Sequence, residues 1–148
     1  MADGGKTPER IDHIGWDLWR ATQAWKRRFT TEMVDRGYPW FAEARGNLLQ
    51  YIDRDGIPQA ELASKAGMTK QAVQQQLDEL TREGLVQRVV DATDARRKLI
   101  QLTPESIQAL RVANEVKRGI EAHYRRLMGD PAMDGLKRSL ALILESEA

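Results

Sequence analysis

The chain has 148 residues and a mass of 16.8 kDa, the size of a single domain that buries about two thirds of the surface its unfolded chain exposes. It carries 23 Lys and Arg against 22 Asp and Glu, so the net charge is +1 and any basic surface must be local. Because the sequence contains no Cys, it excludes thiolate catalysis, thiol redox sensing and every cysteine-ligated zinc or iron–sulfur site.

The N-terminal sequence has none of the features of a secretion signal. Residues 1–5 contain neither a positively charged nor an apolar segment, and no stretch of the chain approaches the roughly 18 apolar residues of a membrane span. We therefore expect a soluble, cytoplasmic protein with no membrane partner. Residues 1–8 are polar, with two Gly and a Pro, and are predicted to be a disordered terminus.

Apolar residues recur every three or four positions between residues 9 and 36. This spacing predicts one long amphipathic helix that stops at Gly37. A second helical pattern follows Pro39 and ends at the Asp55-Gly56 turn signal. The apolar positions of the two patterns are Ile11, Ile14, Leu18, Ala21, Trp25 and Phe29, then Phe41, Ala44, Leu48 and Ile52.

Two shorter helices are predicted between residues 58 and 84. Pro58 fits the first turn of the first helix, and Gly67 fits the left-handed residue that ends it. Thr69 can cap the second helix, which ends at Gly84. Only a tight turn separates the two, an arrangement typical of a helix-turn-helix. The inward positions are Leu62, Ala63 and Ala66, then Val73, Leu77 and Leu80.

The hydrophobic period then changes to two short β-like runs, residues 86–90 and 98–102. They predict a hairpin with a charged tip at residues 91–97. Thr103-Pro104 signals the start of another long helix, and Gly129-Asp130-Pro131 separates it from a last one. Their apolar stripes are Leu110, Ala113, Val116, Ile120, Tyr124 and Leu127, then Met133, Leu136, Leu140, Ile143 and Leu144.

Together these elements predict a mainly α-helical fold with a small β-hairpin. Residues 39–103 have the layout of a winged helix-turn-helix, flanked by a helix at 9–38 and by two helices at 104–148. The flanking helices cannot bury their apolar stripes on the central module alone. A homodimer held by the helices at both ends would bury them.

The predicted helix after Thr69 has an exposed face rich in amides. With Val73, Leu77 and Leu80 inward, the outward residues are Lys70, Gln71, Gln74, Gln75 and Asp78. Gln can bind the N6/N7 edge of adenine in the major groove, and a Lys near a helix N-terminus suits a phosphate. The alternative is a solvated polar face without a partner.

The hairpin concentrates positive charge on one loop. Its four cations outnumber its two acids by two, and Arg on such a loop can enter a narrow minor groove. The alternative is a solvated cluster in which Asp94 pairs with Arg96 and leaves Arg97 free. The charged residues are Arg88, Arg96, Arg97 and Lys98 against Asp91 and Asp94.

These motifs resemble the MarR family of winged-helix transcription regulators over nearly the whole chain. The helix-turn-helix signature consists of Gln59-Ala60-Glu61-Leu62-Ala63, Gly67-Met68-Thr69, Val73, Leu77-Asp78-Glu79-Leu80 and Gly84-Leu85-Val86. The wing signature consists of Asp91, Asp94, Arg96 and Leu102-Thr103-Pro104. The chain departs from the family at Ala72 and Gln74-Gln75, where many members have Ser or Thr and then Thr-Arg, and at Ser106, where Gly is usual.

The resemblance implies an obligate homodimer whose terminal helices interlock and which binds a pseudo-palindromic site in double-stranded DNA. One recognition helix from each subunit would enter successive major grooves, with Arg96 as the wing arginine. The departures in the recognition helix mean that the operator sequence cannot be transferred from relatives. The residues predicted to contact DNA are Thr69, Lys70, Gln71, Gln74, Gln75, Arg88, Arg96, Arg97 and Lys98.

Four Trp residues accompany only two Phe. The resemblance places pockets for small aromatic or phenolic acids between the dimer helices and the winged-helix module. Core or interface packing is the alternative, and it is favoured for Trp25. The candidate ligand-binding residues are Trp16, Trp19 and Trp40, with Arg20 or Arg45 to neutralise a carboxylate.

No compact motif indicates a metal, a cofactor or an enzyme. His13 and His123 are the only imidazoles, lie far apart in the sequence and are expected to be structural or exposed. The sequence has no Gly-rich phosphate loop, no nucleophile elbow and no Ser or Thr beside a recognisable base. We expect no catalytic residues and no metal site.

The function expected first is a repressor whose DNA affinity falls when a ligand holds the two recognition helices at the wrong separation. Two alternatives stay open. One is a DNA-binding regulator without a ligand. The other is a winged-helix adaptor whose mixed charges dock on an acidic protein.

Overall fold

The structure, a computed structural model, describes residues 7–148. Most of the predicted disordered terminus therefore lies outside the described residues. The elements in chain order are α1 (Ile14–Asp35), the 3₁₀ helices η1 (Pro39–Ala42) and η2 (Ala44–Tyr51), β1 (Ile57–Pro58), α2 (Gln59–Ala66), α3 (Lys70–Arg82), β2 (Val86–Val90), β3 (Lys98–Leu102), α4 (Pro104–Met128) and α5 (Asp130–Ser146).

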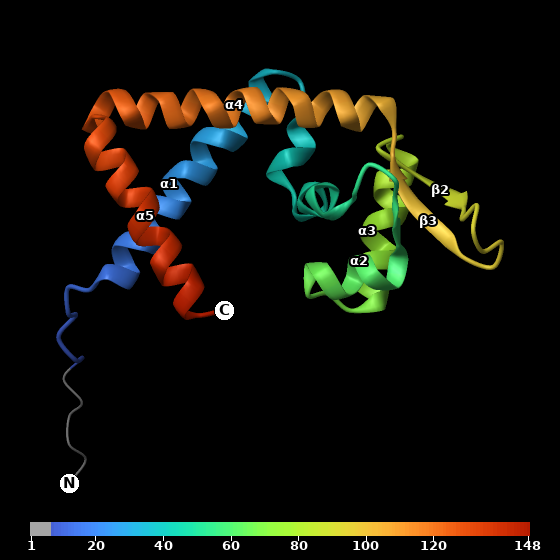
Figure 1. Ribbon diagram of the computed structural model, residues 1–148, viewed down its shortest axis with the longest axis horizontal. Coiled ribbons are helices and arrows are strands. Elements are labelled where there is room, and N and C mark those ends of the chain that lie inside the picture. Colours follow the sequence, from blue (N-terminus) through green and yellow to red (C-terminus); the bar gives the residue numbers. More distant parts are fainter. Residues whose placement is uncertain (1–6) are drawn as a thin grey trace, which may run out of the picture.

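The long helix α4 connects two parts of the molecule (Figure 1). The winged-helix module, formed by α2, α3 and the strands, lies at the N-terminal end of α4. Helices α1 and α5 lie toward its C-terminal half, and the blue-green η1–η2 segment lies between the two parts. The predicted fold class, a mainly helical chain around a winged helix-turn-helix, is confirmed.

The sheet has three antiparallel strands in the order β1-β3-β2, one more than predicted. Ile57 pairs with Ile100, and both side chains are buried. Pro58, expected inside the first turn of a helix, instead ends β1 and is the N-cap of α2. Because β1 is an edge strand, a Pro without an N–H group is tolerated there.

The prediction of a single helix after Pro39 is wrong. Residues 39–51 form two 3₁₀ helices, separated at Glu43, whose backbone is extended with φ −105° and ψ 153°. At Gly46 the chain packs closely against η1, since a Cβ built there would lie 2.7 Å from the Trp40 carbonyl oxygen. Apolar spacing of three or four residues fits either helix type, so the pattern alone could not distinguish them.

Two buried clusters hold the fold together. The larger fills the winged-helix module and includes Leu62, Val73, Leu77 and Leu80, none of which is exposed to solvent. The smaller joins α1 to α4 through Met33, Ala113, Val116 and Ile120. The predicted core faces of α2, α3 and the middle of α4 are therefore confirmed.

A capping box starts α4 and connects it to the end of α3. The Thr103 backbone N–H donates to Ser106 Oγ at 3.0 Å, and the Thr103 hydroxyl donates to the Gly84 carbonyl at 2.7 Å. Ser106 is fully buried. Its hydroxyl completes the capping box, a role that the Gly usual at this position in the MarR family could not fill.

The terminal helices leave much of their apolar surface uncovered. Helix α1 begins at Ile14 rather than near Glu9, and Ile11 lies outside it. The exposed large apolar residues in this part of the molecule are Ile11, Ile14, Trp16, Trp19, Leu127, Leu136, Leu142, Ile143 and Leu144. Within residues 7–148, none of the helices combines the length and the apolar character that crossing a bilayer requires.

The close packing at Gly46 generates a stability prediction. Gly46→Ala should lower the free energy of unfolding by about 1–3 kcal/mol, because the new Cβ meets backbone that cannot move aside easily. The control is Gly119→Ala on an exposed face of α4, where no atom lies within 4 Å and Ala should raise stability by up to about 1 kcal/mol. Urea unfolding measures both, and equal effects of the two variants would contradict the packing argument.

Candidate functional site

Helix α3 presents its polar face as predicted. Val73, Leu77 and Leu80 are fully buried. Thr69 Oγ1 accepts from the Ala72 backbone N–H at 3.1 Å, so Thr69 caps the helix, and its hydroxyl proton is still available to another partner. The exposed residues of the face are Lys70, Gln71, Gln74, Gln75 and Asp78.

A row of side-chain hydrogen bonds crosses this face. Gln59 Nε2 on α2 donates to Gln74 Oε1 at 2.5 Å, and Gln74 Nε2 donates to Asp78 Oδ1 at 2.8 Å. Arg88 on β2 donates to the same Asp78 oxygen at 3.0 Å. We call these four residues the hydrogen-bond relay. Gln74 is thus held at both ends of its amide.

Arg88 lies at the end of the relay rather than free in solvent. Its guanidinium forms an ion pair with Asp78 and also approaches Thr81 Oγ1 at 3.5 Å. The positive charge of Arg88, which was predicted to contact DNA, is therefore offset locally. Among the described residues, Lys70 and Lys98 have no such ion pair and are exposed.

The wing tip is a braced loop. Asp91 Oδ1 accepts from the Thr93 N–H at 2.9 Å and from its hydroxyl at 2.7 Å. These bonds, with the nearby Arg97 guanidinium, hold the pKa of Asp91 below its usual value. Asp94 accepts from the Arg96 backbone N–H at 3.0 Å, which fixes the backbone beneath that side chain.

The two wing arginines differ in their surroundings. The Arg96 side chain is 94% exposed, with Nε 3.6 Å from Asp94. Arg97, expected to be free, lies 3.9 Å from Asp91. The loop therefore presents Arg96 furthest into solvent, from a backbone that its own acids hold in place.

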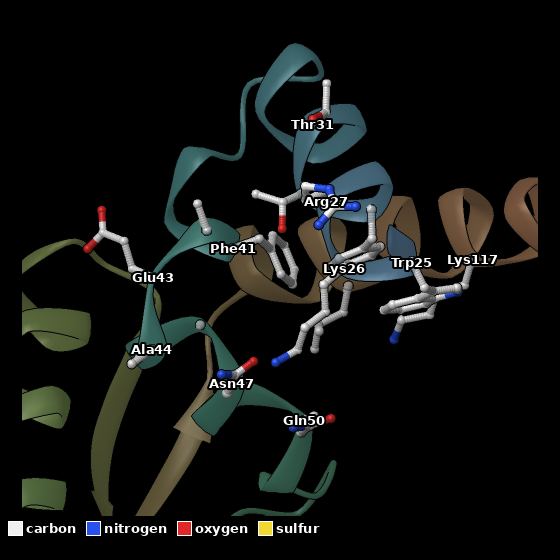
Figure 2. A pocket seen from close by; sticks show the side chains of 15 residues that line it. Trp25, Lys26, Arg27, Thr31, Phe41, Glu43, Ala44, Asn47, Gln50 and Lys117 are labelled. Atoms are coloured by element: carbon white, nitrogen blue, oxygen red, sulfur yellow. The ribbon is translucent and has the colours of Figure 1, made fainter. Parts of the chain in front are cut away.

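A pocket of about 520 Å³ lies at the junction of α1, the η1–η2 segment and α4. Trp25 stacks on Phe29 with ring centroids 5.3 Å apart, and Phe41 meets Phe29 edge-on at 5.6 Å. Figure 2 shows Lys26 reaching toward Asn47 on η2 and Lys117 of α4 beside Trp25.

The charge of the pocket lining is predominantly positive. Lys26, Arg27 and Lys117 line it together with a single acid, Glu43. Lys117 Nζ lies 5.8 Å from the centroid of the Phe29 ring, within cation–π range. Aromatic walls with cations at the rim suit a flat, negatively charged molecule.

None of the five ligand-binding residues predicted from the sequence lines this pocket. Trp40 is only 9% exposed and belongs to the core of the winged-helix module. Trp16 and Trp19 stack at 5.0 Å and border a separate hollow with Arg20 on the outer surface of α1. Trp25, assigned to packing, does line the pocket.

Arg45 is unavailable to a ligand carboxylate because three glutamates surround it. Its guanidinium donates to both carboxylate oxygens of Glu83, at 3.0 and 2.6 Å, and lies 3.5 Å from Glu79. It also contacts Glu43. Arg45 is on η2, which walls the pocket, and Glu79 and Glu83 are in and just after α3. This Arg45 cluster therefore links the pocket wall to α3.

Sequence reasoning missed the residues that line this pocket, including Phe41 and Lys117. Trp25, Lys26 and Phe29 could have been found from their shared helix, but Lys117 is contributed by α4 and reaches the pocket only in the folded state. Over residues 7–148, His, Asp and Glu side chains nowhere gather in threes as metal ligands do.

Comparison with known proteins identifies the family. A MarR family profile matches residues 44–97, from η2 to the end of the wing loop. The transcriptional regulator HosA of Escherichia coli O127:H6 is 30% identical over 97 residues, which are 66% of this chain and 69% of HosA. HosA of Escherichia coli O111:H- is 30% identical over 104 residues, covering 70% of this chain and 74% of that one.

The chain belongs to the MarR family.

Solved structures share the MarR-family fold along nearly the full chain. MepR of Staphylococcus aureus, a transcription regulator of the multidrug efflux pump MepA, has a TM-score of 0.73 at 21% identity and covers 93% of this chain and 100% of its own. A MepR–DNA complex has a TM-score of 0.67 at 24% identity, covering 88% and 98%. At these identities the likeness establishes the common winged-helix fold.

The Arg45 cluster should couple its residues energetically. In a double-mutant cycle, Arg45→Ala and Glu83→Ala should show an interaction of about 1 kcal/mol in unfolding free energy, because the pair is bidentate and the Arg45 side chain is only 18% exposed. The exposed Arg28–Glu32 pair on α1 is the control and should give less than about 0.5 kcal/mol. Equal coupling in both cycles would contradict a structural role for the cluster.

Proposed function

We propose that this MarR-family chain is a homodimeric transcription repressor, not an enzyme, that binds a pseudo-palindromic DNA operator in the cytoplasm and releases it when an aromatic anion binds. The observation that carries the proposal is the pairing, on one module, of an amide-rich helix face with a braced loop that projects Arg96. The MepR–DNA complex supports it through the shared fold.

DNA contacts are assigned by chemistry. Lys70 in the first turn of α3 suits a phosphate, while the amides of Gln71, Gln74 and Gln75 suit base edges in the major groove. Figure 1 shows the wing loop extending outward beside α3. Arg96 at its tip can enter the adjacent minor groove. Phosphate contacts supply affinity and the amides supply specificity.

Dimerisation is assigned to the apolar surface of the terminal helices. Exposed Ile14 and Trp19 on α1, and exposed Ile143 and Leu144 on α5, would be costly to leave in water. A second copy of the chain would cover them. The two copies of α3 would then address half-sites about 34–36 Å apart.

Ligand control is assigned to the 520 Å³ pocket. Its volume lies within the usual range for small-molecule sites, and its three cations outnumber its single acid. One MepR structure binds ethidium bromide, whose organic ion is a cation. The opposite charge is expected to be favoured here, and the preferred ligand is therefore an aromatic acid.

The Arg45 cluster offers a route from the pocket to DNA. Glu43 contributes to the pocket lining and also contacts Arg45, whose guanidinium binds Glu83 beyond the last turn of α3. A ligand that displaces η2 would therefore move α3 with it. Such a rigid-body shift is sufficient to lose one half-site.

Operator binding is tested by selecting bound fragments from a random duplex library at physiological salt. We expect a palindromic motif with half-sites about one helical turn apart. Arg96→Ala should weaken binding to all sequences and lower the slope of binding against log salt by about one. Arg126→Ala, on the far end of α4 from the wing, is the control and should bind as wild type.

The absence of any enriched motif with a folded protein would favour the adaptor function instead. Unchanged binding by Arg96→Ala would refute the assignment of the wing.

Ligand binding is tested by calorimetry with benzoate and 2-naphthoate, each compared with its neutral amide. The acids should bind more tightly, because the lining carries net positive charge. Lys26→Gln with Lys117→Gln should reduce affinity for the acids by roughly tenfold or more and leave the amides unaffected. Lys65→Gln on α2, remote from the pocket, is the control. Operator binding without any response to these acids would favour a regulator with no such ligand.

A further inference from the structure

The three outward amides of α3 are not equivalent. Gln74 is bonded through both its oxygen, to Gln59, and its nitrogen, to Asp78. In the described part of the chain, no side-chain hydrogen bond restrains Gln71 or Gln75. Only one of the three amides is therefore fixed in orientation before any partner arrives.

Asp78 is an unexpected residue on a face that meets phosphates. Its side chain is half exposed, and its charge opposes binding to a polyanion. Arg88 offsets that charge from β2 at 3.0 Å and holds the carboxylate toward Gln74. The arrangement places an acceptor beside the Gln74 nitrogen while limiting the repulsion of DNA.

The relay leaves Gln74 with one free donor and one free acceptor. A primary amide has two N–H groups and two acceptor positions on its oxygen, and the relay uses one of each. The major-groove edge of adenine requires one acceptor for its N6 amine and one donor for N7. Guanine presents two acceptors instead, so a Gln74 with a single remaining N–H cannot satisfy both.

We infer that Asp78 and Gln59 are positioning residues that fix the amide polarity of Gln74 and make it the most stringent reader of an A·T pair in each half-site. This inference rests on the proposed DNA-binding function. Pre-orientation also lowers the side-chain ordering cost of the contact. The unrestrained Gln71 and Gln75 then read their positions with less discrimination.

The test is library selection with wild type, Asp78→Ala, Gln59→Ala, Asp78→Asn and Gln74→Ala. Asp78→Ala should reduce the preference for A·T over G·C by about tenfold at one position per half-site, the position that Gln74→Ala also alters. Its affinity for random-sequence DNA should rise, because an acid is lost and Arg88 is released. Damage to folding would lower both the A·T preference and the affinity for random-sequence DNA. A lower preference together with a higher affinity therefore identifies a positioning role for Asp78.

The other variants separate charge from orientation. Gln59→Ala should relax the same position without changing the salt dependence, since it removes no charge. Asp78→Asn retains a side-chain oxygen to accept from Gln74 and should keep most of the preference. Thermal unfolding of each variant confirms that it is folded.

Each outcome has one meaning. A wild-type motif that Asp78→Ala relaxes at the Gln74 position supports the inference. A wild-type motif that Asp78→Ala leaves intact, or relaxes at every position equally, overturns it while the proposed function stands. If the wild type enriches no motif, the proposed function itself fails.

Discussion

Burial of Val73, Leu77 and Leu80 fixes the rotation of α3 about its own axis, and the candidate DNA surface depends on it. Each fully buried aliphatic side chain contributes about 1.5–3 kcal/mol relative to exposure. A shift of register by one residue would turn the helix by about 100° and bring Gln74, Asp78 and Thr81, or Ala72, Gln76 and Glu79, to the inward positions. The outward position of Gln74 is therefore a consequence of core packing rather than of its own contacts.

Two polar systems then hold α3 against its neighbours at different points. The relay connects its middle turns to α2 and β2, and it determines how the amide of Gln74 is presented. The Arg45 cluster connects its C-terminal end to η2. Because one system orients the outward face of α3 and the other reaches the pocket wall, the proposed DNA readout and ligand control would use separate parts of the same helix.

Sequence patterns predicted well those features that depend on neighbours along the chain. The caps at Thr69 and Thr103 and the buried faces of α3 and α4 follow from local spacing, and the structure confirms them. The prediction of one helix over the η1–η2 segment was wrong, because apolar spacing cannot reveal the close approach of Gly46 to Trp40.

The site was less predictable for the same reason. Arg45 was assigned to a ligand, yet its partner Glu83 lies 38 residues away in the sequence. Trp40, a candidate ligand residue, belongs to the module core, whereas Trp25, assigned to packing, packs against the α1–α4 cluster and also lines the pocket. Pairings of this kind exist only after helices pack, so no local pattern indicates them.

The position of the pocket explains how a small ligand could control the proposed contact between the protein and DNA. Its walls come from α1 and α4, which carry Lys26 and Lys117, and from η2, which carries Asn47 and packs on the core of the winged-helix module. In the proposed function, a molecule that contacts both sides would restrain the angle between the terminal helices and the module that carries α3. Because α3 lies beyond this junction, a small rotation there becomes a displacement along DNA, whose base pairs repeat every 3.4 Å. In the proposed homodimer, the displacements at the two half-sites would occur in opposite directions and could not be corrected by sliding the whole protein.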